Sequence, residues 1–277
     1  MQEHTGVDLQ MSVAYEAGDI SASRASNRRY SWDLVTHLVG REFRLRYRRT
    51  IFGWLWAMGY PLARLLVLAF LFTRILPLGI ENYAAFAFTG IIAWSWFATG
   101  IASATSSVID RRDLLIRPGV PRSAVPIVSV LTDGLDYLAA LPVLAVFLLL
   151  EDGIPLTALL LPVILVVQFL FTLGFGLALC AANVYLRDVR LLVDVVMLLG
   201  FYLTPVFYDA QSVPDRYRLV LDLNPMAHLL SAYRDILIAG HAPATVPFLV
   251  LTTVGMAILA VGYLIYRWAS PSFVDEL

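Results

Sequence analysis

Residues Ile154 to Leu186 read IPLTALLLPVILVVQFLFTLGFGLALCAANVYL and include no charged side chain. A helix needs about 20 mostly apolar residues to cross the hydrocarbon core of a bilayer. This stretch exceeds that requirement, and it carries no charge that would be costly to bury in lipid. It predicts a membrane-spanning helix, and so it places the chain among integral membrane proteins.

The rest of the chain has the same character. Of its 277 residues, 59% are hydrophobic and 15% are charged, and the mean hydropathy is +0.74, which is too apolar for a solvated domain. We predict an all-α integral membrane protein with six transmembrane helices within residues 51–267. The predicted spans lie near Gly53–Pro77, Tyr83–Ile109, Ser123–Leu150, Ile154–Leu186, Leu191–Phe207 and Ala242–Tyr266.

The placement of arginine predicts the orientation. All 20 basic residues are arginines, and cytoplasmic loops of membrane proteins retain positive charge. With both termini in the cytoplasm, fifteen arginines fall inside, four fall outside and Arg64 lies within the bilayer. We therefore expect residues 1–30 to be a loose cytoplasmic tail without the apolar core of a signal peptide, and residues 268–277 to be a cytoplasmic C-terminus.

Residues 31–50 predict an amphipathic helix on the membrane surface, which we call the interface helix. At 100° per residue, aromatic and apolar residues share one face and arginines share the opposite one: Trp32, Val35, Val39, Phe43 and Tyr47 against Arg41, Arg44 and Arg48. Two interpretations stay open. The arginines either fix the topology and bind anionic membrane lipid, or they also help the helix to dock onto a cytoplasmic partner.

The loop 110–122, DRRDLLIRPGVPR, is the main cytoplasmic connection, and we call it the coupling loop. Its charged residues flank an apolar centre: Arg111, Arg112, Asp113 and Arg117 surround Leu114, Leu115 and Ile116. A loop that only connected two spans would need no apolar centre. The pattern predicts a surface that presses into a groove on a partner, with a loop lying on the membrane face as the alternative.

Within the predicted outer segment 212–239, Leu219 to Ala239 is moderately apolar but carries charges such as Asp222, Arg234 and Asp235. A charge at mid-bilayer costs about 2.5–3.5 kcal/mol on the insertion scale, so this segment should not span the membrane in contact with lipid. We expect two short helices on the outer side, starting near Pro214 and Pro225 and forming a re-entrant pair between the fifth and sixth spans.

Charges also fall inside the predicted spans. Arg64 lies within the first span and needs a partner there. Asp133 and Asp136, which share a face of the third span, and Asp194, near the start of the fifth, are the candidates. A structural ion pair is the favoured interpretation, and a contact with the substrate is the other.

Aromatic residues are candidates to line a transport path: Trp56, Tyr60, Trp94, Trp96, Phe201 and Tyr202. Trp94 and Trp96 lie deeper in their span than a headgroup belt of aromatics predicts. Rings that line a pore can stack against the apolar faces of sugars. Packing between helices explains the same residues equally well.

Other residue types exclude classes of chemistry. The chain has no lysine, and so it has neither a P-loop lysine nor a Schiff base; any coupled nucleotide hydrolysis must occur on another polypeptide. Cys180 lies in an apolar run and predicts a buried small side chain. The four histidines show no metal-ligand spacing. We expect no catalytic residue, no metal site and no cofactor in this chain.

Six motifs follow one another along the chain from about Tyr30 to Arg267: REFRLRYRRTIFGWLWAMGYPL (41–62), TGIIAWSWF (89–97), LLIRPGVPRSAVPI (114–127), YLRDVRLLVD (185–194), LTPVFY (203–208) and NPMAHLLSAYRDIL (224–237). In this order over six spans, the chain resembles a permease subunit of the ABC-2 class. The likeness is to bacterial ABC exporters for lipid-linked polysaccharides such as O antigen, teichoic acid and cell-wall galactan.

The resemblance implies partners and roles. Two copies would form the channel in the inner membrane, and two separate ATPase subunits, using ATP and Mg²⁺, would drive a lipid-linked polysaccharide outward; membrane lipids but no nucleic acid would be bound. Residues 41–49 would be the interface helix of the family, 110–121 its coupling helix and 212–237 its outer gate helices. The gate residues would include Asn224, Pro225, Tyr233 and Arg234.

Three other functions fit parts of the pattern. A drug or antibiotic efflux permease belongs to the same ABC-2 class. A secondary transporter fits the hydropathy, but the second, fourth and sixth spans carry no charge to couple ions. A membrane-embedded enzyme acting on lipid-linked sugars would use Asp133 and Asp136 to hold Mg²⁺, but no nucleophile and base accompany them.

Overall fold

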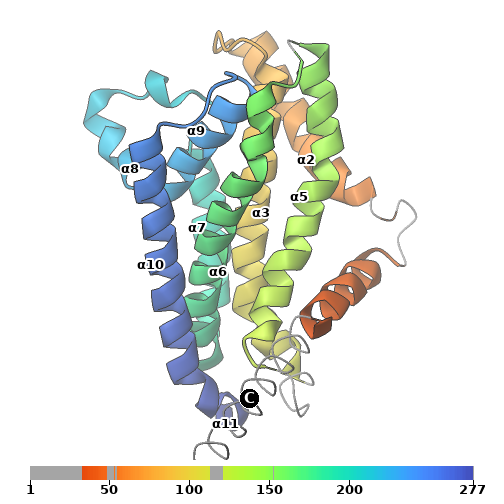
Figure 1. Ribbon diagram of the computed structural model, residues 1–277, viewed down its shortest axis with the longest axis vertical. Coiled ribbons are helices and arrows are strands. Elements are labelled where there is room, and N and C mark those ends of the chain that lie inside the picture. The colour runs from red at the N-terminus through yellow and green to blue at the C-terminus, as the bar shows by residue number, and fades with distance from the viewer. Residues whose placement is uncertain (1–32, 49–52, 54, 113–120, 152, 277) are drawn as a thin grey trace, which may run out of the picture.

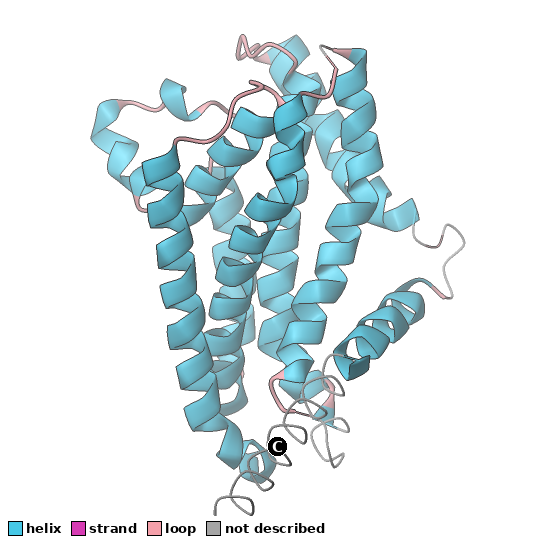
Figure 2. Cartoon of the chain, in the orientation of Figure 1, coloured by secondary structure: helices cyan, strands magenta, loops and turns pink. Residues whose placement is uncertain are grey.

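The computed structural model describes residues 33–48, 53, 55–112, 121–151 and 153–276. Every regular element in these ranges is a helix, which confirms the predicted all-α class (Figure 1, Figure 2). The long helices run side by side along the long axis of the molecule, and the interface helix, at residues 33–47, lies obliquely beside the lower half of α5 (Figure 1).

The long helices of the described part form one bundle: α2 (Leu55–Phe70), α3 (Tyr83–Asp110), α5 (Ala124–Leu150), α6 (Leu161–Tyr185), α7 (Asp188–Leu203) and α10 (Thr245–Ala269). Shorter elements extend or connect them. A π-helical turn continues α2 (Leu71–Ile75), and 3₁₀ turns occupy Leu156–Leu160, Ala210–Ser212, Asp215–Tyr217 and Ser270–Ser272. The short helices are α8 (Arg218–Asp222), α9 (Pro225–Leu237) and α11 (Phe273–Glu276).

Helix α3 is the centre of the bundle. It packs against α2, α5, α6, α7 and α9, and its Phe88, Ile91 and Ile101 are almost completely buried. Its sequence is rich in alanine, glycine, serine and threonine, which let neighbouring helices approach closely in a membrane protein. The core is therefore built around α3, and the helices around it expose their outer faces.

Helices α6 and α10 meet at a pair of glycines. A Cβ added to Gly262 would overlap the carbonyl oxygen of Gly174, and one added to Gly174 would lie 2.7 Å from the backbone nitrogen of Leu259. The two backbones are therefore in direct contact. Because lipid tails give no hydrophobic force between helices, such close packing of small residues is what holds them together.

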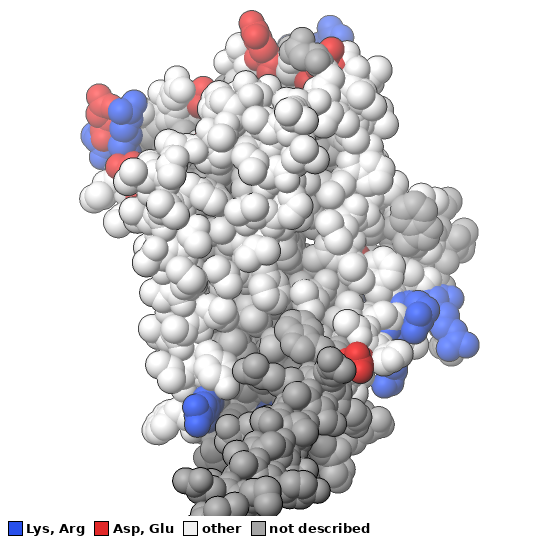
Figure 3. Space-filling model, in the orientation of Figure 1, with Lys and Arg blue, Asp and Glu red and all other residues white. Residues whose placement is uncertain are grey.

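Of the helices in the described ranges, five are long and apolar enough to cross a membrane: Leu55–Ile75, Tyr83–Asp110, Ala124–Leu150, Leu156–Tyr185 and Thr245–Ser272. They correspond to the first four predicted spans and the sixth. The chain is therefore a multi-pass membrane protein. On the face seen in Figure 3, charged side chains gather near the upper end and along the interface helix, and the surface between them is largely uncharged.

Helix α7 differs from the predicted fifth span near Leu191–Phe207. It has 16 residues, from Asp188 to Leu203, which gives a length of about 24 Å against the ~30 Å of a hydrocarbon core. It ends early because Thr204, which precedes Pro205, adopts an extended backbone with φ −92° and ψ 141°. A residue before proline disfavours the helical conformation.

The segment after α7 forms short helices, as the sequence predicts. Pro225 occupies the first turn of α9, and the side chain of Asn224 caps this helix by accepting a hydrogen bond from the backbone nitrogen of Met226. Pro214 instead directly precedes the 3₁₀ turn at Asp215–Tyr217. Helix α9 packs against α3 and α6, where Leu229 and Tyr233 are fully buried.

Candidate functional site: the interface helix and its ionic links

The interface helix has the two faces that its sequence predicts. Val35 is buried and packs with Ala124 and Val128 at the start of α5. On the other side of the helix, Arg41, Arg44 and Arg48 are exposed. Trp32 lies outside the described residues. The helix is thus attached to the bundle through its apolar face, and these three arginines remain exposed.

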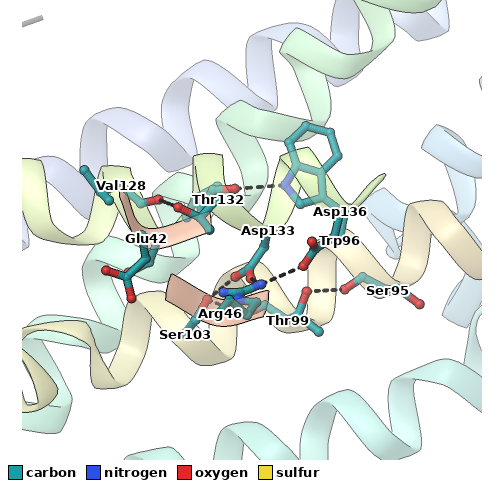
Figure 4. Close-up of polar contacts among 12 residues, drawn as sticks. Glu42, Arg46, Ser95, Trp96, Thr99, Ser103, Val128, Thr132, Asp133 and Asp136 are labelled. Carbon is teal, nitrogen blue, oxygen red and sulfur yellow. Dashed lines mark hydrogen bonds and ion pairs between the residues drawn. The ribbon is translucent and has the colours of Figure 1, made fainter. Parts of the chain in front are cut away.

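Arg46 makes the strongest link between this helix and the bundle. Its Nη1 lies 2.7 Å from Oδ1 of Asp133 and 2.6 Å from Oδ2 of Asp136, both on α5 (Figure 4). The hydroxyl of Tyr47 donates a hydrogen bond of 2.8 Å to Oδ1 of Asp136. The hydroxyl of Ser103, on α3, donates to Oδ2 of Asp133. One arginine therefore joins the interface helix to two carboxylates on α5.

The burial of Asp133 explains why this link is needed. Its side chain is only 3% exposed, and a buried carboxylate without a partner is strongly unfavourable. Partial burial acts to lower the pKa of Arg46, but attraction to Asp133 and Asp136 outweighs it, so the pKa is raised and the guanidinium stays charged. Arg46 is therefore the charged partner that these two carboxyl groups face.

These contacts correct the predicted pairing of Arg64 with Asp133 or Asp136. Both carboxylates are engaged by Arg46, whereas the guanidinium of Arg64 lies over aromatic rings, 5.0 Å from the centroid of Tyr60 and 4.9 Å from that of Phe201. Cation–π contacts let an arginine remain charged in an apolar environment. The sequence predicted that Arg64 needs partners, but not that aromatic rings supply them.

The sequence did contain a signal for Arg46. Arg46 is eleven residues after Val35, which places it about 20° from Val35 at 100° per residue. It is therefore an arginine in the middle of the apolar face. A charge at such a position requires a buried counter-charge on the element against which the face packs.

A second ionic link joins the interface helix to the coupling loop. Nη2 of Arg111 lies 3.0 Å from Oε1 of Glu42, and its Nη1 donates a hydrogen bond of 2.7 Å to the hydroxyl of Ser129 on α5. At the other end of the loop, Arg122 donates to the backbone oxygen of Ser270. Asp113, Leu114, Leu115, Ile116 and Arg117 lie outside the described residues.

The predicted pore aromatics occupy different environments. Tyr60, Trp94, Phe201 and Tyr202 line a groove of about 600 Å³ between α2, α3 and α7, which we call the aromatic groove; Arg64 and Asp194 also line it. Trp96 is placed elsewhere. Its Nε1 donates a hydrogen bond of 3.1 Å to the backbone oxygen of Val130, so this indole is held against α5.

Trp56 also lies outside the aromatic groove. It lines a smaller cavity of about 160 Å³ that also contains Tyr47, Asp133 and Asp136. Four of the six candidate aromatics therefore share one groove, and two lie beside the ionic cluster. The sequence predicted these aromatic residues as candidates to line a transport path, but not which of them share a groove.

The predicted gate residues serve as anchors for α9. The side-chain amide of Asn224 donates a hydrogen bond of 2.8 Å to the hydroxyl of Thr204, and the hydroxyl of Tyr233 donates one of 2.7 Å to Oε1 of Gln168 on α6. Nη2 of Arg234 donates one of 2.9 Å to the backbone oxygen of Val206. These bonds hold α9 against the end of α7 and against α6.

The geometry around the two aspartates is unsuited to catalysis with a metal. Arg46 supplies the positive charge that a cation would provide between Asp133 and Asp136, and Ser103 and Tyr47 donate to the same carboxylates. In the part of the chain that the structure describes, no group of three His, Cys, Asp or Glu side chains is placed to hold a metal ion. The cluster is an ionic contact between the interface helix and α5.

The sequence of the chain is similar to those of known proteins. The model of the ABC-2 type transporter family matches residues 33–238. The O-antigen export system permease protein RfbA of Myxococcus xanthus is 32% identical over 247 residues, covering 88% of this chain and 95% of that protein. A Klebsiella pneumoniae protein of the same name is 29% identical, covering 87% and 95%.

A more distant relative is the polysialic acid transport protein KpsM of Escherichia coli, which is 23% identical and covers 84% of this chain and 92% of its own length. The family match begins at the interface helix and continues through α9, so it includes both ionic links and the aromatic groove. The chain therefore belongs to the ABC-2 type transporter family.

Proposed function

We propose that this chain is the membrane-spanning permease subunit of an ABC exporter that moves a lipid-linked polysaccharide from the cytoplasmic to the outer side of a bacterial inner membrane. The observation that carries the proposal is its likeness, over nearly all of its length, to permeases named for O-antigen export and polysialic acid transport. The absence of lysine supports a separate ATPase subunit, because this chain has no P-loop lysine.

The aromatic groove supports a sugar polymer as the cargo. Tyr60 and Tyr202 are each more than half exposed, and Arg64 lies between Tyr60 and Phe201. Aromatic faces stack on the apolar faces of sugar rings without selecting one orientation, which suits a chain that must slide. We assign the start of the transport path to this groove.

A second copy of the chain completes this path in the proposal. Helices α2 and α7, which form two walls of the groove, leave large apolar side chains exposed, among them Leu66, Phe70, Leu192 and Leu199. Such a continuous apolar surface is covered either by lipid or by another helix face. We infer a homodimer that pairs these faces, so that two grooves meet in one channel.

The topology completes the proposal. In this proposal α7, although short, is the fifth of six spans, and the outer helices α8 and α9 follow it as a re-entrant pair. Arginine placement then puts both termini in the cytoplasm. On that side lie the coupling loop and the interface helix, where an ATPase would dock.

The two ionic links suggest how a motion of the ATPase reaches the spans. Force on the coupling loop passes through Arg111 to Glu42 on the interface helix, and from Arg46 to Asp133 on α5. The interface helix thus acts as a lever that is tied to the loop and to a spanning helix. Rigid-body movement of packed helices is a common way for a protein to switch between two states.

Export from cells tests the proposed function. The chain and its ATPase are expressed in a strain that makes a lipid-linked polysaccharide but lacks its own permease. We expect antibody to label the polymer on intact cells, and the label to be lost when the P-loop lysine of the ATPase is replaced. Polymer that stays inside, or drug resistance that rises without polymer export, would contradict the proposal.

A further inference from the structure

A second large groove lies under the interface helix, away from the aromatic groove. Its volume is about 600 Å³, and we call it the leaflet groove. Val35, Val39 and Gly40 form its wall on the interface helix, Leu135 belongs to α5 and Phe169 to α6. No residue that lines it carries a charge. A groove of this composition binds something apolar.

The floor of the leaflet groove is mostly apolar. It includes the indole of Trp96, whose Nε1 already donates to the backbone oxygen of Val130. The indole fits there because Gly134 has no side chain, since a Cβ on this glycine would lie 3.2 Å from the ring. The occupant of the groove therefore makes mainly apolar contacts at this depth.

The groove opens toward lipid. Leu138, on its α5 side, is 47% exposed, and Val166, on its α6 side, is 59% exposed. Both residues belong to helices that are long and apolar enough to span the membrane. Exposed apolar side chains of such helices face acyl chains, so a lipid from the surrounding bilayer reaches the groove directly.

A positive charge lies at the rim of this groove. A Cβ on Gly40 would lie 3.8 Å from Nη1 of Arg44, so the guanidinium of Arg44 is beside a residue that lines the groove. Arg44 is exposed, and among the described residues it has no acidic partner. Arg41, in contrast, lines a different pocket together with Glu42.

We propose that the leaflet groove binds one anionic phospholipid of the surrounding bilayer, with an acyl chain along its apolar walls and the headgroup phosphate on Arg44. An apolar groove with a cation at its rim matches an amphiphile with a negative head. One rim arginine suits the single charge of a phosphodiester. The site is separate from the transported cargo, and it would make the position of the interface helix depend on the lipid composition.

The proposal is tested by counting bound lipids. Purified full-length protein in detergent is titrated with phosphatidylglycerol or with phosphatidylcholine of the same acyl chains, and native mass spectrometry measures the occupancy. We expect one phosphatidylglycerol per chain to bind more tightly than phosphatidylcholine. Arg44→Gln should weaken the binding of phosphatidylglycerol about fivefold and leave that of phosphatidylcholine unchanged, because one arginine near an anionic headgroup contributes about that much.

A second variant tests the groove itself. Gly40→Leu places a side chain in the space that the acyl chain would fill, and it should weaken both lipids. Leucine also favours helix more than glycine does, so the interface helix is expected to stay folded. Arg187→Gln, at an exposed arginine between α6 and α7, is the matched control and should bind both lipids as the unaltered chain does.

Four outcomes would overturn the proposal. Phosphatidylglycerol binding that is unchanged in Arg44→Gln removes the headgroup site, and binding of both lipids that is unchanged in Gly40→Leu removes the groove. If glycerol phosphate displaces bound phosphatidylglycerol as effectively as the whole lipid does, the site binds a free anion and not a phospholipid. Displacement by a polyprenyl diphosphate at lower concentration would assign the groove to the carrier of the cargo.

Discussion

Arg46 and Asp133 approach to 2.7 Å, although one belongs to the interface helix and the other to a helix that is long and apolar enough to cross a membrane. A surface helix held by apolar contacts alone can slide over its neighbours. A buried ion pair with a fixed geometry prevents this, because any displacement separates the charges. We therefore expect the interface helix and α5 to move together.

Breaking this pair should destabilise the protein. Arg46→Gln leaves the carboxylate of Asp133 buried without its cation, and we expect the free energy of unfolding to fall by about 3 kcal/mol. We expect a loss at the low end of the range for buried ion pairs, because the side chain of Arg46 is 33% exposed and water weakens the interaction. Adding Asp133→Asn to Arg46→Gln should lower the free energy of unfolding only a little further. Denaturant unfolding in detergent measures the single and the double variant. Additive losses would show that the two residues are not coupled.

Arg64 should behave independently of the same aspartate. Its guanidinium lies over Tyr60 and Phe201, so Arg64→Gln and Asp133→Asn are expected to be additive within about 0.5 kcal/mol. The same unfolding measurement on the single and double variants decides the question. A coupling energy as large as that between Arg46 and Asp133 would restore the pairing suggested by the sequence.

The sequence predicts the spanning helices well where composition alone decides them. The uncharged stretch at Ile154–Leu186 became a 3₁₀ turn and α6, and α3, α5 and α10 lie close to their predicted bounds. Helix α7 was predicted too far along the chain, because hydropathy continues past Thr204 whereas the backbone turns before Pro205. Hydropathy measures solvent preference, and it does not detect such a turn.

The site was harder to predict, because ion pairs depend on which helix faces which. Asp133 and Asp136 were identified as charges inside a span and as candidate partners of Arg64, which belongs to another span. The structure places the partner of Asp133 on the interface helix instead, 87 residues earlier in the chain. Helical periodicity locates Arg46 on the apolar face, but it does not say that α5 is the surface covered by that face.

The contact between α6 and α10 gives a prediction about packing. Gly262→Ala places a methyl group against the carbonyl oxygen of Gly174, so the helices must separate, and we expect a loss of about 1–3 kcal/mol in unfolding free energy. Gly59→Ala on α2 is the matched control, since its Cβ would lie 3.7 Å from Trp56 and alanine favours the helix. Equal effects of the two variants would contradict direct backbone contact at Gly174.

The coupling loop gives a prediction about function rather than stability. Deleting Leu114 to Ile116 removes the apolar centre that we assign to the groove of an ATPase, and we expect export to be abolished while membrane insertion and chain yield stay normal. Glu42→Gln should reduce export only in part, because Arg111 keeps its hydrogen bond to Ser129 when the ion pair is lost. Arg187→Gln changes an exposed arginine outside this loop and should export normally. Surface labelling of the polymer measures all three, and undiminished export by the deletion variant would refute the assignment of this loop to the ATPase.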